Sequence, residues 1–237
     1  MQRIHDLCRS VDESPRLVVA LERALDGAMS LLDADFGNVQ LVNPATGELR
    51  ILAESGFSSE FLDYFSRVDD ERSACGRAAR QRSQTVIVDV DEDPAFAPHR
   101  EIAAASGFRA VQSTPLIDPT GRLRGVISIH FRRPRRPCRR DLHIMEWYAD
   151  RVAAAVGHQL VAPTTLFAAN AALHERTADL HEATASLMFE GAQVALAAGH
   201  AVEAADRLKK ATRAWVHVGR ERERARALNQ RANASPR

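Results

Sequence analysis

Uncharged side chains that form hydrogen bonds recur at alternate positions of three strand-like segments. The stretch Gly107–Leu116 is the most telling, since it carries such groups where an ordinary core strand would carry Val or Ile. The pairs are Asn38 with Gln40, Gln112 with Thr114, and Ser128 with His130. Because alternate residues of a strand point to the same side, we expect each strand to have one apolar face and one polar face.

A buried polar face has a cost that restricts its interpretation. Each buried polar group without a partner costs about 1–3 kcal/mol. In one interpretation these groups bond to crossing loops and ordered waters, and no ligand is involved. In the other they line a small-molecule pocket, in which a few convergent polar groups interrupt apolar walls. The alternation alone favours neither.

Cys75 lies at the start of a predicted short helix, in Ser73–Gly76. A helix N-terminus lowers the pKa of a thiol, so a reactive cysteine is one interpretation. The favoured one is a small buried residue that lets the following glycine pack closely. Cys8 and Cys138 lie outside the predicted strands and pocket loops, which argues against an enzyme that uses several cysteines together.

His130 and Arg109 are the other candidates for ligand contacts. His130 could contact a haem or another ligand, but a core histidine that bonds to a neighbour is the favoured interpretation. Arg109 could hold an anionic ligand through a bidentate contact or form a salt bridge with the acidic group at Asp89–Asp93, and the two stand equal. That group lacks the glycine and final glutamate of a calcium loop. No second His or Cys lies at metal-ligand spacing, so we predict no metal.

The segment Arg132–Arg140 contains six arginines in nine residues. Such a cluster could contact phosphates. Two prolines within it predict an exposed loop, and no aromatic residue accompanies the arginines. Nucleic acid is therefore a disfavoured partner.

The overall composition limits the function classes further. The chain has 237 residues, of which 45% are hydrophobic and 27% charged, and its net charge is +1. This is typical of a globular protein and provides no general attraction for a membrane surface. No window approaches the roughly 18 consecutive apolar residues of a membrane span, and we predict no signal peptide. Three widely separated cysteines are typical of a reducing compartment, so we expect a cytoplasmic protein.

Periodicity predicts an α+β domain over residues 15–160, preceded by an N-terminal segment, 1–14. Its first helix should begin with Ser14 as N-cap and Pro15 in the first turn, and its last should run from Asp141 to about Leu160. The predicted strands are Asn38–Val42, Glu48–Ala53, Thr85–Val90, Ala110–Ile117 and Leu123–Phe131. Short turns make the sheet largely antiparallel. Each terminal helix has a single apolar stripe, so both should cover one face.

The polar face should then be covered by what lies between residues 55 and 108. This stretch contains two predicted short helices, Phe57–Val68 with an aromatic face and Ala74–Arg82. An acidic, proline-bearing loop follows and passes into a small Ala-rich helix.

Residues 166–237, after a linker at 161–165, should be helical throughout because they are rich in Ala, Leu, Glu and Arg. Apolar residues recur every seven positions and predict a helical seam, although Arg176 and Glu190 occupy the second apolar positions of a coiled coil. The members of this series are Leu166, Leu173, Leu180, Leu187 and Val194.

The segment that follows this series resembles the turn and second helix of a tetratricopeptide-like hairpin. The residues that carry this likeness are Gly199, Ala204, Leu208 and Ala211. A single unit of that kind cannot bury its own apolar face, so it must pack on the sheet domain, a dimer mate or a partner.

From about Leu17 to His158 the chain resembles a GAF domain of the bacterial signalling kind, often found beside histidine kinases. The order and spacing of several short motifs carry the resemblance. These motifs are Gly37–Leu41, Gly47–Leu49, Gly56–Phe57 with Phe61–Phe65, Ala74–Gly76, Asp89–Val90 with Asp93–Phe96, Gly107–Leu116 and Gly125–Phe131.

The resemblance implies a PAS-like antiparallel sheet in which the first strand lies beside the last, and the last beside the middle one. This places the three polar pairs on one face, over a cavity in which GAF domains typically bind small molecules. It also implies dimers through the terminal helices. The expected site residues are Asn38, Gln40, Cys75, Phe96, Phe108, Arg109, Gln112, Thr114, Ser128 and His130.

We therefore expect a non-catalytic, cytoplasmic sensory module whose ligand, and any cofactor, the sequence does not name. It would relay ligand binding through its terminal helices to a dimer mate or a partner such as a histidine kinase. The first alternative is a ligand-free interaction scaffold. The second is a thiol-based enzyme like the methionine sulfoxide reductases built on this fold, with Cys75 at its centre.

Overall fold

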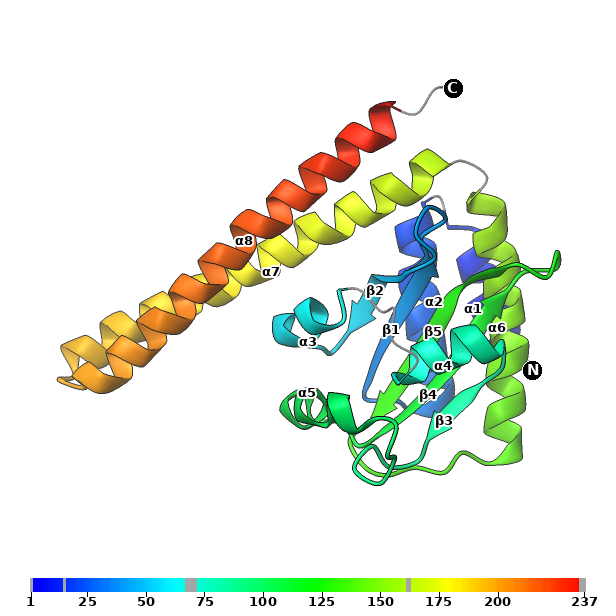
Figure 1. Cartoon of the computed structure of the whole chain (residues 1–237), viewed down its shortest axis with the longest axis horizontal. Coiled ribbons are helices and arrows are strands. Elements are labelled where there is room, and N and C mark those ends of the chain that lie inside the picture. Colours follow the sequence, from blue (N-terminus) through cyan, green and yellow to red (C-terminus); the bar gives the residue numbers. More distant parts are fainter. Residues whose placement is uncertain (1, 15, 67–71, 161–162, 235–237) are drawn as a thin grey trace. The chain divides into compact units, whose positions relative to one another are not determined.

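The computed structural model describes residues 2–14, 16–66, 72–160 and 163–234. The chain divides into two compact units, Met1–Thr165 and Leu166–Arg237, and each is described by itself (Figure 1). Within the described residues, no helix is both long and apolar enough to cross a membrane.

The first unit is built on a five-stranded antiparallel sheet with the order β2-β1-β5-β4-β3. The first strand lies beside the last and the last beside the long middle strand, which confirms the predicted fold class and neighbours. The strands are β1 (Phe36–Val42), β2 (Leu49–Ser55), β3 (Thr85–Ile87), β4 (Ala110–Ile117) and β5 (Leu123–Phe131).

Two helices pack on one face of this sheet, α2 (Leu17–Leu32) and α6 (Arg139–Gln159), and α1 (Gln2–Asp12) packs against both of them. The Tyr148 hydroxyl in α6 donates a hydrogen bond to the Ala24 carbonyl in α2 at 3.1 Å. A Cβ at Gly27 would lie 2.1 Å from that hydroxyl oxygen, so glycine is what lets α2 and α6 approach closely. The two terminal helices therefore cover one face, as predicted.

The predicted start of the first helix was wrong. The N-terminal segment forms α1, and the Ser14 hydroxyl donates to the Ser10 carbonyl at 2.8 Å instead of capping α2. The N-cap of α2 is Arg16, whose side chain makes no capping hydrogen bond. Pro15, predicted for the first turn, lies outside the described residues.

Short helices lie around the opposite face, with α4 (Ala74–Gln81) packed on β3, β4 and β5 (Figure 1). The others are α3 (Ser59–Tyr64), the 3-10 turn η1 (Ala97–His99) and α5 (Arg100–Ser106). The hydroxyls of Ser58 and Ser73 cap α3 and α4. The predicted helix from Phe57 is shorter than expected, and the prediction's end at residues 67–68 lies outside the described part of the chain.

The strand register corrects the predicted polar face. Directly opposite residues of an antiparallel pair project to the same side. Ser128 of β5 lies opposite Asn38 of β1 and also opposite Ser113 of β4. Ser113 therefore shares the face of Asn38, whereas its neighbours Gln112 and Thr114 project to the face covered by α2 and α6.

The second unit is a hairpin of two long helices, α7 (Pro163–Ala197) and α8 (Ala201–Ala234), with Gly199 in the turn at φ 81°. They lie side by side along much of their length (Figure 1). A hydrogen bond joins the side chains of His174 and Glu221, and Arg222 contacts Glu182 at 2.6 Å. Residues 163–165 of the predicted linker belong to α7, and residues 161–162 are outside the described ranges.

Small residues at seven-residue spacing form the buried seam of the hairpin. They are Ala171, Ala178, Ala185 and Ala192 in α7, and Ala204, Ala211, Val218 and Ala225 in α8. The predicted leucine seam was wrong, because Leu180, Leu187 and Val194 are 43%, 68% and 70% exposed.

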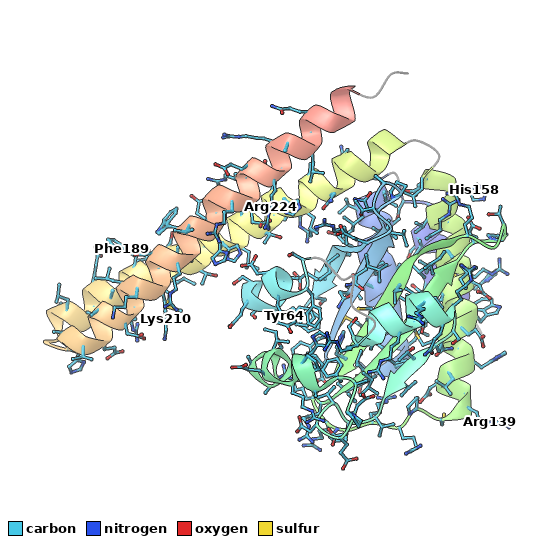
Figure 2. All side chains as sticks on the ribbon, viewed as in Figure 1. Tyr64, Arg139, His158, Phe189, Lys210 and Arg224 are labelled. Carbon is cyan, nitrogen blue, oxygen red and sulfur yellow. The ribbon has the colours of Figure 1, made fainter. Side chains whose placement is uncertain are left out.

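The large side chains project outward from this hairpin, as Phe189 does in Figure 2. The two helices have 35 and 34 residues. Each is as long as a whole tetratricopeptide repeat, so the hairpin does not fit that interpretation.

Candidate ligand-binding cavity

A cavity of about 20 Å³ lies between the sheet and the short helices of the first unit. Its polar lining comes from the sheet and from the N-cap of α4: Asn38, Gln40, Ser73, Ser113, Ser128 and His130. Its apolar lining consists of Phe61, Phe65, Ala74, Cys75, Phe96, Phe108 and Val111. Seven of the ten predicted site residues therefore line one cavity, and Ser113 joins them.

Three polar atoms of this lining are buried without a hydrogen-bond partner. They are Asn38 Oδ1, Gln40 Oε1 and His130 Nδ1. The residues are only 3%, 1% and 5% exposed, so bulk water does not compensate for them. By contrast, Ser113 and Ser128 share a hydrogen bond of 2.7 Å between their hydroxyls.

His130 is surrounded by aromatic rings. The ring centroids of Phe108 and Phe57 lie 4.7 and 5.0 Å from its own, both edge to face. Burial lowers the pKa of His130 from 6.5 to about 3, since the charged imidazolium cannot be hydrated there. The imidazole is therefore neutral near pH 7.

Cys75 lines the cavity but is not an activated thiol. Burial raises its pKa, and hydrogen bonds from Ser73, the Gly76 amide and Gln40 oppose this shift only in part. The Ser73 hydroxyl lies 3.3 Å from the sulfur. The thiol therefore stays protonated near neutral pH, which fits the small, buried residue favoured from the sequence.

Gln112 and Thr114 do not line this cavity, because they point to the opposite face of β4 from the one predicted. The Gln112 amide donates to Gln84 Oε1 at 2.9 Å, and the Gln84 amide donates to the Leu142 carbonyl of α6 at 2.7 Å. Gln112 thus ties the sheet to a terminal helix. The sequence prediction missed Ser113. The signal that could have identified it is its polarity at the alternate position between Gln112 and Thr114.

Arg109 also lies outside the cavity lining. Its guanidinium contacts both carboxylate oxygens of Asp89, at 2.9 and 2.7 Å, and lies 3.1 Å from a carboxylate oxygen of Asp91. Although desolvation opposes the shift, this pairing holds the pKa of Asp89 below its usual range. The salt bridge to the acidic loop is the correct alternative for Arg109.

The arginine segment 132–140 has a structural role in part. Arg132 stacks over the Phe36 ring at 4.5 Å, and Arg135 over the Phe131 ring at 4.3 Å. Arg135 also lies 3.6 Å from the Asp141 carboxylate at the start of α6. These contacts fix the connection between β5 and α6. Arg139, the first residue of α6, is exposed (Figure 2).

Among the described residues, the cavity lining contains no Asp, Glu, Lys or Arg. Its polar groups are amides, hydroxyls, a thiol and a neutral imidazole. Such a lining can orient a small molecule through hydrogen bonds, but it supplies neither a charged general base nor a thiolate nucleophile.

The family model described as GAF domain matches residues 16–156. The chain belongs to the GAF domain family. GAF domains are sensory and signalling modules, generally regulatory in role. No curated protein matches the chain.

Several solved structures, GAF domains among them, share its fold. The GAF domain of a phosphoenolpyruvate-protein phosphotransferase from Coxiella burnetii gives a TM-score of 0.59 at 19% identity, covering 66% of this chain and 92% of that one. Free methionine-R-sulfoxide reductase from Neisseria meningitidis gives 0.55 at 19% identity, covering 66% and 87%. The chromophore-binding domain of a bacteriophytochrome from R. palustris gives 0.53 at 20% identity, covering 67% and 60%.

Proposed function

We propose that this GAF protein is a non-catalytic sensory module that binds a small molecule in the cavity described above. It passes the signal through its terminal helices to a dimer mate or to a signalling partner such as a histidine kinase. The observation that carries the proposal is the convergence of three buried atoms without partners, from Asn38, Gln40 and His130, on one cavity. Buried polar groups are usually paired, so a bound molecule is the partner this arrangement lacks.

The hydrogen bonds of β4 support a route from the cavity to the helices. Ser113 lines the cavity, and the adjacent Gln112 is linked through Gln84 to the backbone of α6. A ligand that shifts β4 would therefore change the contacts of α6. Ligand binding can bias the positions of the terminal helices only through such differential contacts.

A ligand-free scaffold is the second candidate, and the size of the cavity favours it. A volume of about 20 Å³ suffices for one ordered water, which needs at least about 10–15 Å³. A water could satisfy the polar atoms in place of a ligand. Binding anything larger requires the aromatic side chains of α3 and the neighbouring loops to move.

The reductase alternative finds no support in the thiol chemistry. The raised pKa of Cys75 leaves little thiolate at neutral pH, and thiolate is the nucleophilic form.

Native mass spectrometry of the full chain, purified without denaturation, tests the proposal. We expect a bound mass that disappears on denaturation, together with dimers. Asn38→Leu should lose the bound mass because it replaces a lining amide with an apolar side chain of similar size. Thr114→Val, which removes a buried hydroxyl on the opposite face, should retain it. A wild-type protein that carries only water would instead support the scaffold.

A further inference from the structure

We propose that the cavity selects an uncharged ligand that donates hydrogen bonds, such as a molecule with a primary amide group, and that it excludes anions. This inference rests on the proposed function and adds the chemical class of the ligand. It excludes phosphate- and carboxylate-bearing molecules as occupants of the cavity.

The charges of the site argue against an anion. Within the described residues, no cationic side chain lines the cavity. Arg109, the cation predicted for this role, is held by Asp89 and Asp91 outside it. The imidazole of His130 is neutral near pH 7. A buried anion would therefore meet no cationic side chain, only the partial positive charge at the start of α4, where the Gly76 amide already donates to the Ser73 hydroxyl. Burying a charge without a full counter-charge is far more costly than burying a neutral polar group.

The unpartnered atoms indicate what the ligand must offer. Asn38 Oδ1 and Gln40 Oε1 are carbonyl oxygens, which only accept hydrogen bonds. A carboxylate or phosphate at pH 7 brings mainly further acceptors and would leave these oxygens unpaired. An N–H or O–H group satisfies them, and His130 Nδ1 completes the set as a donor or an acceptor according to its tautomer.

The walls restrict the remainder of the ligand. Phe61, Phe65, Phe96 and Phe108 line the cavity, and their rings provide apolar surface without further polar groups. An apolar or flat body with one compact amide-like end matches this distribution of polar and apolar groups, and it enters once the aromatic side chains move apart. Sites of this kind reject analogues that lack the matching donor, because the buried partner is then left unpaired.

Formamide and formate form a matched pair for the test, because they have nearly the same size and shape but differ in charge at pH 7. Each is titrated into the full-length protein while the NMR signals of the Asn38 and Gln40 side-chain amides are followed. We expect formamide to give saturable shifts with a dissociation constant of about 1 mM or weaker, the limit for three heavy atoms. Formate should bind at least tenfold more weakly.

Two variants assign the binding to the cavity. Asn38→Leu should weaken formamide binding at least tenfold, as judged from the Gln40 signal. Thr114→Val, which removes a buried hydroxyl from the other face, should leave it unchanged. Equal effects of the two variants would show that the probe binds elsewhere and would overturn the inference.

The remaining outcomes separate the inference from the proposed function. Formate binding as tightly as formamide, and lost in Asn38→Leu, overturns the selection against anions but leaves a ligand-binding cavity. If neither probe shifts the signals and native mass spectrometry shows no bound mass, both the proposed sensory function and the proposed ligand class are refuted.

Discussion

Both faces of the sheet bury polar side chains, but these side chains have different partners on the two faces. On the helix face, Gln112 is 2% exposed and joins β4 to α6 through Gln84. On the cavity face, Asn38 and His130 are 3% and 5% exposed, and each has a polar atom without a partner. Polar side chains in a buried strand can thus bond to a neighbouring element or line a binding cavity. Which of the two applies depends on the layer that covers that face.

The helix face is not free of unpartnered atoms. Thr114 Oγ1 and Gln112 Oε1 also lack partners, but neither residue lines the cavity. Their desolvation lowers the stability of the fold without serving a ligand. The helix face therefore serves as an internal control, because its unpartnered polar atoms lie away from the cavity and should not be affected by ligand or water there.

The largest difference between the faces should come from the protonation of His130. Its pKa is about 3 in the fold and 6.5 ordinarily, so the unfolded chain binds the additional proton between these values. The free energy of unfolding should fall as the pH drops from about 6.5 towards 3, by up to about 1.4 kcal/mol per pH unit or about 5 kcal/mol in total. Chemical denaturation across this range measures it.

Replacement of the histidine isolates this contribution. His130→Phe fits the surrounding aromatic cluster and should flatten the decline of stability between pH 6.5 and 3. The matched control is His158→Phe, at an exposed position of α6 (Figure 2), which should leave the decline intact. An unchanged slope in His130→Phe would mean that His130 takes up its proton in the folded protein at ordinary pH.

Removing the hydrogen bond between Gln112 and Gln84 on the helix face should have an intermediate effect on stability. Gln112→Leu keeps a side chain of similar size but leaves the Gln84 carbonyl without its donor. We expect the free energy of unfolding to fall by about 1–2 kcal/mol, because the lost bond to the half-buried Gln84 is offset in part by removal of the unpartnered Gln112 Oε1. Formamide binding, being on the other face, should not change. A variant as stable as the wild type would show that the link through Gln84 contributes nothing to holding α6.

The resemblance to GAF domains predicted which strands are neighbours, and helical periodicity predicted the two terminal helices, but the sequence did not show which residues of β4 face the cavity. The apolar alternation of β1 and β5 identifies their polar faces, and Asn38 and Ser128 indeed lie opposite each other. In β4, Gln112, Ser113 and Thr114 are polar in succession, and layers cover the strand on both sides. When both faces are buried, the hydrophobic pattern specifies register weakly.

In the helical hairpin, too, the sequence pattern did not identify which residues are buried. The seven-residue spacing of larger residues, such as Leu187 and Val194, predicted a seam because buried leucines usually mark one in coiled coils. The structure instead buries the alanines that recur every seven residues, such as Ala185 and Ala211. Ala side chains are common at all positions of this segment, so their periodicity is hard to distinguish from high helix propensity.

The smallest effects provide the most direct comparison, because one hydroxyl is removed from each face. Ser113→Ala breaks the 2.7 Å bond to Ser128 on the cavity face and should lower the free energy of unfolding by about 1 kcal/mol. Thr114→Val removes an oxygen that has no partner, so stability should stay the same or rise slightly. Denaturation of both variants at pH 7 measures the two changes. If Thr114→Val is destabilised as much as Ser113→Ala, the Thr114 hydroxyl has a partner after all, and the helix face no longer serves as a reference for the cavity.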